Sequence, residues 1–174
     1  MLAGPIDYTP GIFDIEFNQY QPKNRVHTTR AKQLALYPII FSPHQMAADL
    51  PENYQGAEEF EFIKNVPVTW DDTLVPQAKI GDYVTIARRK GEEWYLGTIT
   101  DEEPRELKIK LDFLDEDQAY RAYIYEDGPN ADYESNPTDV AIRKRKVDAN
   151  DVLSASLIKS GGQAVRLVPI TKTE

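Results

Sequence analysis

The chain of 174 residues contains no cysteine. Disulfide bonds, thiol catalysis and thiolate metal sites are therefore excluded. It also lacks a run of about 18 apolar residues, which a membrane-spanning helix needs. Its N-terminus has no basic segment followed by an apolar stretch, so any export signal of the parent protein is expected to lie elsewhere.

Positive charge is scarce in this chain. Lysine and arginine together number 20 against 29 acidic residues, which gives a formal net charge of −9. A phosphate backbone or an anionic membrane would repel the chain as a whole. Nucleic acid and membrane surfaces are therefore excluded as partners.

The first part of the sequence has a helical pattern. HTTRAKQLALYPIIF predicts a helix that begins behind Thr28 or Thr29 as N-cap and ends or kinks at Pro38. Because its apolar residues lie on nearly every face, the helix is expected to be buried. A short extended segment ending at Asp49 follows, and GAEEFEFIKNV predicts a second helix.

From about Ile80 onward the hydrophobic period changes to two, as in half-buried strands. Leu107, Ile109 and Leu111, for example, alternate with lysines. Seven such runs are expected, at 81–89, 93–100, 105–112, 118–126, 138–147, 151–158 and 163–169. Seven short antiparallel strands predict a β-sandwich of two sheets.

The two parts differ in whether they can bury their own apolar faces. About 100 residues of alternating strands can close a core, but strand, buried helix, strand and helix cannot cover one another. That order, with acids at the strand ends, is typical of the last quarter of a (β/α)8 barrel. The predicted fold is mainly β with an α/β portion: residues 1–68 end a barrel, and residues 69–174 form an antiparallel β-sandwich.

Six stretches together resemble the C-terminal part of glycoside hydrolase family 97: MLAGPIDYTPGIF, TTRAKQLALY, SPHQMAADLPENY, GDYVTIARR, WYLGTITDE and YEDGPNADYESNP. The resemblance implies the seventh barrel strand at Leu2 to Ile6 and its helix near Thr28 to Phe41. It also implies the eighth strand near His44 to Leu50 and the final helix around Ala57 to Val66. The remainder would be the C-terminal sandwich.

The family resemblance also implies a function. Members are mostly α-glucosidases, with some α-galactosidases, that act on α-linked oligosaccharides, and the parent would be periplasmic. The catalytic glutamates and the glutamate ligands of a calcium cofactor would lie before Met1. This chain would then hold neither catalytic nor metal residues and would be inactive alone, while its sandwich supports the barrel or homo-oligomerisation.

Four residues are candidates for the rim of a substrate pocket. Asp7 and Asp49 lie at the ends of the expected barrel strands, where substrate-facing groups collect, although acids there also cap helices or bind loops. Tyr8 and Met46 could form apolar walls for a sugar ring. Core packing is the favoured alternative for Met46.

Two further constellations carry weaker signals. Ser42, His44 and Asp49 are triad residue types without a nucleophile elbow, so a triad is not expected. The loop EDGPNADYE supplies oxygen ligands suited to calcium but lacks the glycine of an EF-hand, and a solvated loop is favoured. Its possible ligands are Asp127, Asn130, Asp132 and Glu134.

Aromatic residues in the strands leave an alternative function open. Trp70, Trp94 and the tyrosines at 120–125 could stack on sugars, although core packing is the commoner role. The basic run at 143–146 is expected to be a solvated edge. The chain is therefore either the end of an exo-acting α-glycosidase or a free-standing, non-catalytic sandwich that binds glycan or protein.

Overall fold

The computed structural model describes residues 7–16 and 24–171. The expected strand from Leu2 to Ile6 lies outside these residues. The described part contains three helices, α1 (Arg30–Ile39), α2 (Pro51–Tyr54) and α3 (Phe60–Asn65). Its eight strands are β1 (Asp72–Lys79), β2 (Tyr83–Lys90), β3 (Glu93–Thr100), β4 (Arg105–Lys110), β5 (Tyr120–Asp127), β6 (Val140–Val147), β7 (Val152–Leu157) and β8 (Gly162–Pro169).

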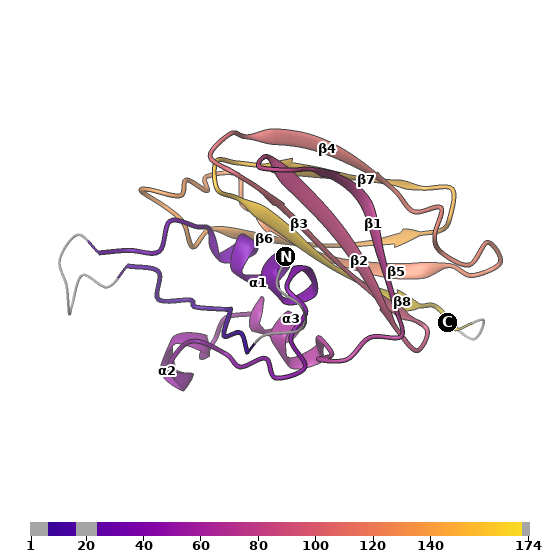
Figure 1. Ribbon diagram of the computed structural model, residues 1–174, viewed down its shortest axis with the longest axis horizontal. Helices are drawn as coiled ribbons and strands as arrows, with labels where there is room; N and C mark the ends of the chain where they lie inside the picture. The colour runs from indigo at the N-terminus through magenta and orange to yellow at the C-terminus, as the bar shows by residue number, and fades with distance from the viewer. Residues whose placement is uncertain (1–6, 17–23, 172–174) are drawn as a thin grey trace.

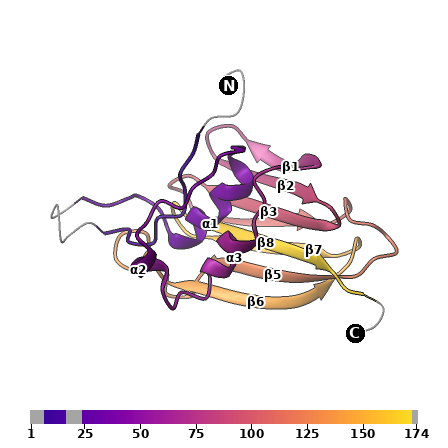
Figure 2. The ribbon, with the colours of Figure 1, turned by 90° about the horizontal axis from the view of Figure 1, so that it is seen from below.

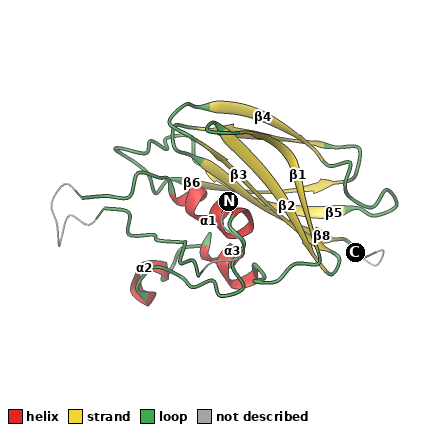
Figure 3. Ribbon diagram, in the orientation of Figure 1, coloured by secondary structure: helices red, strands yellow, loops and turns green. Residues whose placement is uncertain are grey.

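The strands form two antiparallel sheets, which confirms the predicted sandwich. Six strands pair in the order β1-β2-β3-β8-β5-β6, and β4 pairs with β7 in a separate two-stranded sheet. Figure 1 shows the small sheet on one side of the large sheet and the helices on the other. The secondary-structure colours of Figure 3 show the same three layers. The large sheet is therefore the middle layer of the described part.

The space between the two sheets holds the first core. It is lined by residues from β2 to β8, including Leu96, Ile124, Leu153 and Leu167, all at most 2 % exposed. In β7, buried and exposed residues alternate strictly, as the sequence predicts. This core contains no residue from the segment before residue 69.

A second core lies between the helices and the opposite face of the large sheet (Figure 2). Leu34 and Tyr37 of α1 and Phe62 of α3 pack there with Tyr95 of β3 and Tyr125 of β5. The Phe62 ring meets Tyr95 and Tyr125 edge to face, at centroid distances of 6.1 and 5.6 Å. Both faces of the large sheet are thus covered by apolar packing.

The predicted helix near 28–41 is confirmed as α1. The Thr29 side chain accepts a hydrogen bond from the Lys32 backbone N–H at 3.1 Å, which makes Thr29 the N-cap. The helix ends at Ile39, directly after Pro38. The second predicted helix appears in shortened form as α3, and α2 was not predicted.

One expected strand does not form, and one observed strand was not predicted. No strand forms at 44–50, where a barrel strand was expected. Among the described residues, only segment 8–10 pairs with this segment, and the pairing is limited to one parallel bridge between Tyr8 and Gln45. Strand β1 was missed because it is an edge strand with seven of eight residues exposed. Without a buried face, β1 shows no alternation in its sequence.

No helix in the described ranges is both long and apolar enough to span a membrane.

Candidate functional site

Two of the four candidate rim residues lie side by side. The Met46 backbone N–H donates a hydrogen bond to the Tyr8 carbonyl at 3.3 Å, next to the bridge between Tyr8 and Gln45. Met46 is 46 % exposed, and Asp7 is also exposed. Burial raises the pKa of the half-buried Tyr8. The fold thus leaves the side chains of Asp7 and Met46 exposed.

The carboxylate of Asp49 is engaged in hydrogen bonds. One oxygen accepts the N–H groups of Phe13 and Asp14 at 2.8 and 2.6 Å, and the other accepts Leu50 N–H and the Asn53 amide at 2.8 and 2.6 Å. Partial burial acts to raise the pKa of Asp49, but these bonds outweigh it and leave the pKa below its ordinary value. Asp49 therefore ties loop 13–14 to the start of α2.

Two tyrosines that were not predicted as site residues also bind the loop that precedes Phe13. The Tyr54 hydroxyl donates to the Gly11 carbonyl at 2.9 Å and accepts the Asp49 N–H at 2.8 Å. The Tyr37 hydroxyl lies 3.2 Å from the Pro10 carbonyl and 2.5 Å from the place of a Cβ on Gly11. Since Gly11 also has a φ of +82°, only glycine fits there.

The structure does not assemble the triad residue types. The Ser42 hydroxyl accepts the backbone N–H of His44 at 3.2 Å rather than a bond from the imidazole. His44 is exposed, and both oxygens of Asp49 bind elsewhere. This arrangement lacks the bond from base to nucleophile that a triad requires.

The acidic loop after β5 does not fit calcium. Asp127 is buried and bound to Thr29, whereas one oxygen of Asp132 accepts three hydrogen bonds from Glu134 and Ser135. Within the described ranges, no group of three or more His, Cys, Asp or Glu could hold a metal ion. Carboxylates that bind protein donors in separate places cannot form one coordination shell.

The strand aromatics belong mainly to the two cores. Trp94 and Tyr120 are 5 and 4 % exposed between the sheets, and Tyr125 is 5 % exposed beneath α3. Trp70 lies against Tyr95, with ring centroids 5.5 Å apart. Core packing, the alternative that the sequence favoured, describes these rings.

The basic run at 143–146 is exposed on β6, the outer strand of the large sheet. Arg143 pairs with Glu126, and Arg145 pairs with Asp151 at 2.9 Å. The expected solvated edge is confirmed.

Helix α1 lies against the large sheet in close backbone contact. A Cβ on Gly97 of β3 would collide with the Ala35 carbonyl and lie 2.9 Å from both Pro38 and Ile39 side chains. A Cβ on Gly162 of β8 would lie 2.6 Å from the Lys32 Cα. Ala164, which pairs with Gly97, is fully buried. We call Gly97, Gly162 and Ala164 the α1 seat.

The N-terminal end of α1 is fixed by a buried acid. The Thr29 hydroxyl donates to one oxygen of Asp127 at 2.6 Å, and the other oxygen accepts the N–H groups of Gly162 and Ile158 at 3.1 and 3.3 Å. Burial raises the pKa of Asp127 to about 6, against the opposing effect of these bonds. The Lys32 ammonium donates to the Thr100 carbonyl at 2.7 Å.

The C-terminal end of α1 is fixed by a buried cation. The guanidinium of Arg88, on β2, donates to the carbonyls of Pro38 and Ile39 and to the Thr73 hydroxyl. Burial lowers its pKa. A positive charge at the last carbonyls and a negative one at the first turn both complement the helix dipole. Thus α1 is bound at both ends and along its length.

The sequence reasoning did not find the α1 seat, although a signal was present. An isolated glycine within a strand pattern, such as Gly97 in WYLGTIT, often marks a close approach of another backbone. Arg88 and Asp127 gave no comparable signal. Arg88 begins the charged run RRK, which looks exposed, and Asp127 was assigned to the solvated loop.

Comparisons with known proteins cover both parts of the chain. A family model described as "Glycosyl-hydrolase 97 C-terminal, oligomerisation" matches residues 69–168. A retaining alpha-galactosidase of Bacteroides thetaiotaomicron is 34 % identical over 95 % of this chain, which corresponds to 25 % of that protein.

Solved structures give the same result. A Glycoside Hydrolase Family 97 enzyme in complex with acarbose, from Pseudoalteromonas sp. strain K8, is 47 % identical with a TM-score of 0.91 over 97 % of this chain and 27 % of its own. A beta-arabinopyranosidase is 25 % identical with a TM-score of 0.77, covering 94 % of this chain and 25 % of its own. The chain thus spans about a quarter of the length of these relatives. It belongs to glycoside hydrolase family 97, of which it represents the C-terminal part with the oligomerisation domain.

Proposed function

We propose that the parent protein is an exo-acting α-glycosidase on α-linked oligosaccharides and that this chain supports its barrel without supplying the catalytic acid or base. The similarity to a retaining alpha-galactosidase and to a family 97 enzyme in complex with acarbose supports the activity. The anchoring of α1 on the sandwich by the α1 seat, Asp127 and Arg88 carries the proposed supporting role. An element held in this way fixes the loops at its ends, and catalytic geometry depends on such rigidity.

The proposed domain division places the end of the (β/α)8 barrel at residues 1–68 and the sandwich at residues 69–174. The core between the sheets supports independent folding of the second part, because every residue in it follows residue 86. In such a parent protein, one face of the sandwich would pack against the barrel. Its remaining surfaces could contact a second subunit.

The rest of the active site belongs, in this proposal, to the missing part of the parent. Glycoside hydrolysis needs two carboxyl groups at a defined separation across one sugar. The family resemblance assigns those glutamates, the calcium ligands and a periplasmic location to the parent. From this chain, Asp7, Tyr8, Met46 and Asp49 would contribute to the pocket rim.

The chain alone is expected to release no product from p-nitrophenyl α-glucoside or α-galactoside, with or without calcium. Exposed carboxyl pairs in water keep pKa values near the ordinary range and lack the protonated acid that the reaction needs at neutral pH. The measurement is absorbance after incubation with the purified chain. Product release that follows the protein peak through repeated purification would show a complete site within these residues.

Substitutions in the full-length parent test the rim. Asp7→Ala is expected to lower kcat/KM by about tenfold or more with an unchanged melting temperature, because Asp7 is exposed. Asp49→Ala should lower both, since four hydrogen bonds to its carboxylate are lost. Steady-state kinetics and thermal unfolding measure the two effects. Unchanged kcat/KM in both variants would remove these residues from the rim.

A further inference from the structure

The turn between β1 and β2 presents a fully exposed large apolar side chain. Ile80 has a relative exposure of 102 %, the highest among the exposed large hydrophobic residues of the described part. The neighbouring Gly81 adopts a φ of +88°, which the tight turn needs. Single exposed apolar residues are common on protein surfaces, so the exposure of Ile80 alone does not indicate a binding surface. The residues around it must be considered as well.

An apolar hollow of about 440 Å³ lies next to Ile80. Ala78, Val84 and Ile99 contribute its apolar walls, and Lys32 lies at its border with α1. Ile80 itself forms part of the rim. A protruding apolar side chain beside an apolar hollow is self-complementary, because two copies related by a two-fold axis can exchange the same contact.

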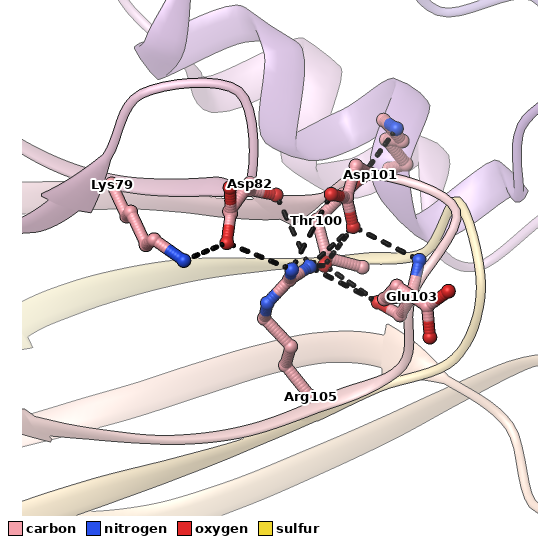
Figure 4. Close-up of polar contacts among 7 residues, drawn as sticks. Lys79, Asp82, Thr100, Asp101, Glu103 and Arg105 are labelled. Atoms are coloured by element: carbon pink, nitrogen blue, oxygen red, sulfur yellow. Dashed lines mark hydrogen bonds and ion pairs between the residues drawn. The ribbon is translucent and has the colours of Figure 1, made fainter.

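The turn is held rigid by a network of charges (Figure 4). Asp82 accepts the Lys79 ammonium at 2.6 Å and lies 3.2 Å from Arg105, which also binds Asp101. The hydrogen bond from Arg105 lowers the pKa of Asp101 to about 2. The Asp101 N–H donates to the Asp82 carbonyl at 2.8 Å. A side chain on a fixed turn loses little conformational freedom when it binds.

The backbone of β1 is unsuited to pairing with another strand. Pro76 has no N–H, and the register of β1 against β2 is interrupted between Leu74 and Gln77. Proline and bulges both oppose the addition of a further strand at a sheet edge. A partner at this edge must therefore bind through side chains.

We propose that the surface formed by Ile80, Ala78, Val84 and Ile99 binds the same surface of a second copy of this chain. The oligomerisation role described for the matched family model argues for a second copy as the partner. The apolar centre is bordered by Lys79, Asp82 and Asp101, whose charges are paired within the chain, so a polar rim surrounds an apolar contact without leaving an unpaired charge in it. The inference rests on the proposed role of the sandwich in oligomerisation.

Sedimentation analysis of the chain across a micromolar concentration series tests the surface. The wild-type chain is expected to dimerise, and Ile80→Glu to weaken the dimer by about tenfold or more, because a charge would enter the apolar contact. Val152→Glu is the matched control, since Val152 is 41 % exposed on β7 in the other sheet. It should dimerise like the wild type. Circular dichroism verifies that each variant is folded.

Three outcomes would overturn the proposal. The wild-type chain could stay monomeric, Ile80→Glu could dimerise as well as the wild type, or Val152→Glu could weaken the dimer equally. In the full-length parent, Ile80→Glu should leave the activity per subunit unchanged while it weakens association. Loss of activity and melting temperature without a change in association would show that the missing part of the parent covers Ile80. An inactive wild-type parent would refute the proposed activity but leave the dimer result standing.

Discussion

Replacing Gly97 with valine is expected to lift α1 from the large sheet and to destabilise the chain by about 3 kcal/mol or more. The new side chain would occupy the place of the Ala35 carbonyl and of the Pro38 and Ile39 side chains. A loss of this size corresponds to a fall of roughly 6 to 12 °C in melting temperature. Thermal unfolding by circular dichroism measures it, and hydrogen exchange should show that α1 loses protection before β5.

A matched control separates this clash from the effect of a β-branched residue in a strand. Ser154→Val adds valine at an exposed position of β7 and should change the melting temperature little. Gly97→Val in a shortened chain of residues 69–174 should also have little effect, because α1 is absent. If all three variants lose the same stability, α1 has no part in the effect.

The stability of the chain should depend on Asp127 between about pH 4 and pH 6. The ordinary pKa of this group is 3.8, and burial raises it to about 6 in the folded chain. As the pH rises through this window, the unfolded chain releases the proton while the folded chain retains it, so the contribution of Asp127 to stability falls. About two pKa units correspond to roughly 3 kcal/mol, with the full contribution present below pH 4 and lost above pH 6.

Two variants isolate this contribution from the other acids. In Asp127→Asn, the amide oxygen can accept the Ile158 and Gly162 N–H groups while its NH₂ donates to the Thr29 hydroxyl, without a charge. The difference in unfolding free energy between wild type and this variant should therefore fall by roughly 3 kcal/mol from pH 4 to pH 7. A constant difference across that range would contradict the raised pKa.

Asp127→Ala removes the acceptor altogether. The Gly162 and Ile158 N–H groups and the Thr29 hydroxyl would lose their partner. This costs about 2 to 4 kcal/mol relative to Asp127→Asn at every pH, because neither variant carries the titrating acid. Chemical denaturation at several pH values measures both variants.

Local patterns in the sequence predict much of this fold. Thr29 behaves as a cap because its hydroxyl needs only the next turn of its own helix. The alternation at Leu153, Ala155 and Leu157 reports a face that is buried wherever the strand lies. β1 escaped prediction because its side chains are exposed on both faces.

Contacts between distant segments could not be predicted in the same way. Asp127 meets Thr29 across 98 positions, and Arg88 meets Pro38 across 50. Nothing in EDGPNADYE distinguishes a buried acid from a solvated one, because the residues that bury Asp127 come from α1 and β8. For the pocket rim, residue types and positions along the chain could be predicted. The hydrogen bonds of Tyr37 and Tyr54 to segment 10–11 could not, because they depend on how three separate segments meet.

The α1 seat also determines how this region could be exchanged between related enzymes. Gly97 and Gly162 are shaped for one backbone path of α1, and Asp127 and Arg88 bind that helix at its two ends. A chimera joined at residue 69 would place a foreign helix on these glycines. A joint before Thr28 would transplant the helix together with its sheet. The exchangeable unit is therefore the sandwich with α1 attached, and it crosses the boundary between the two proposed domains.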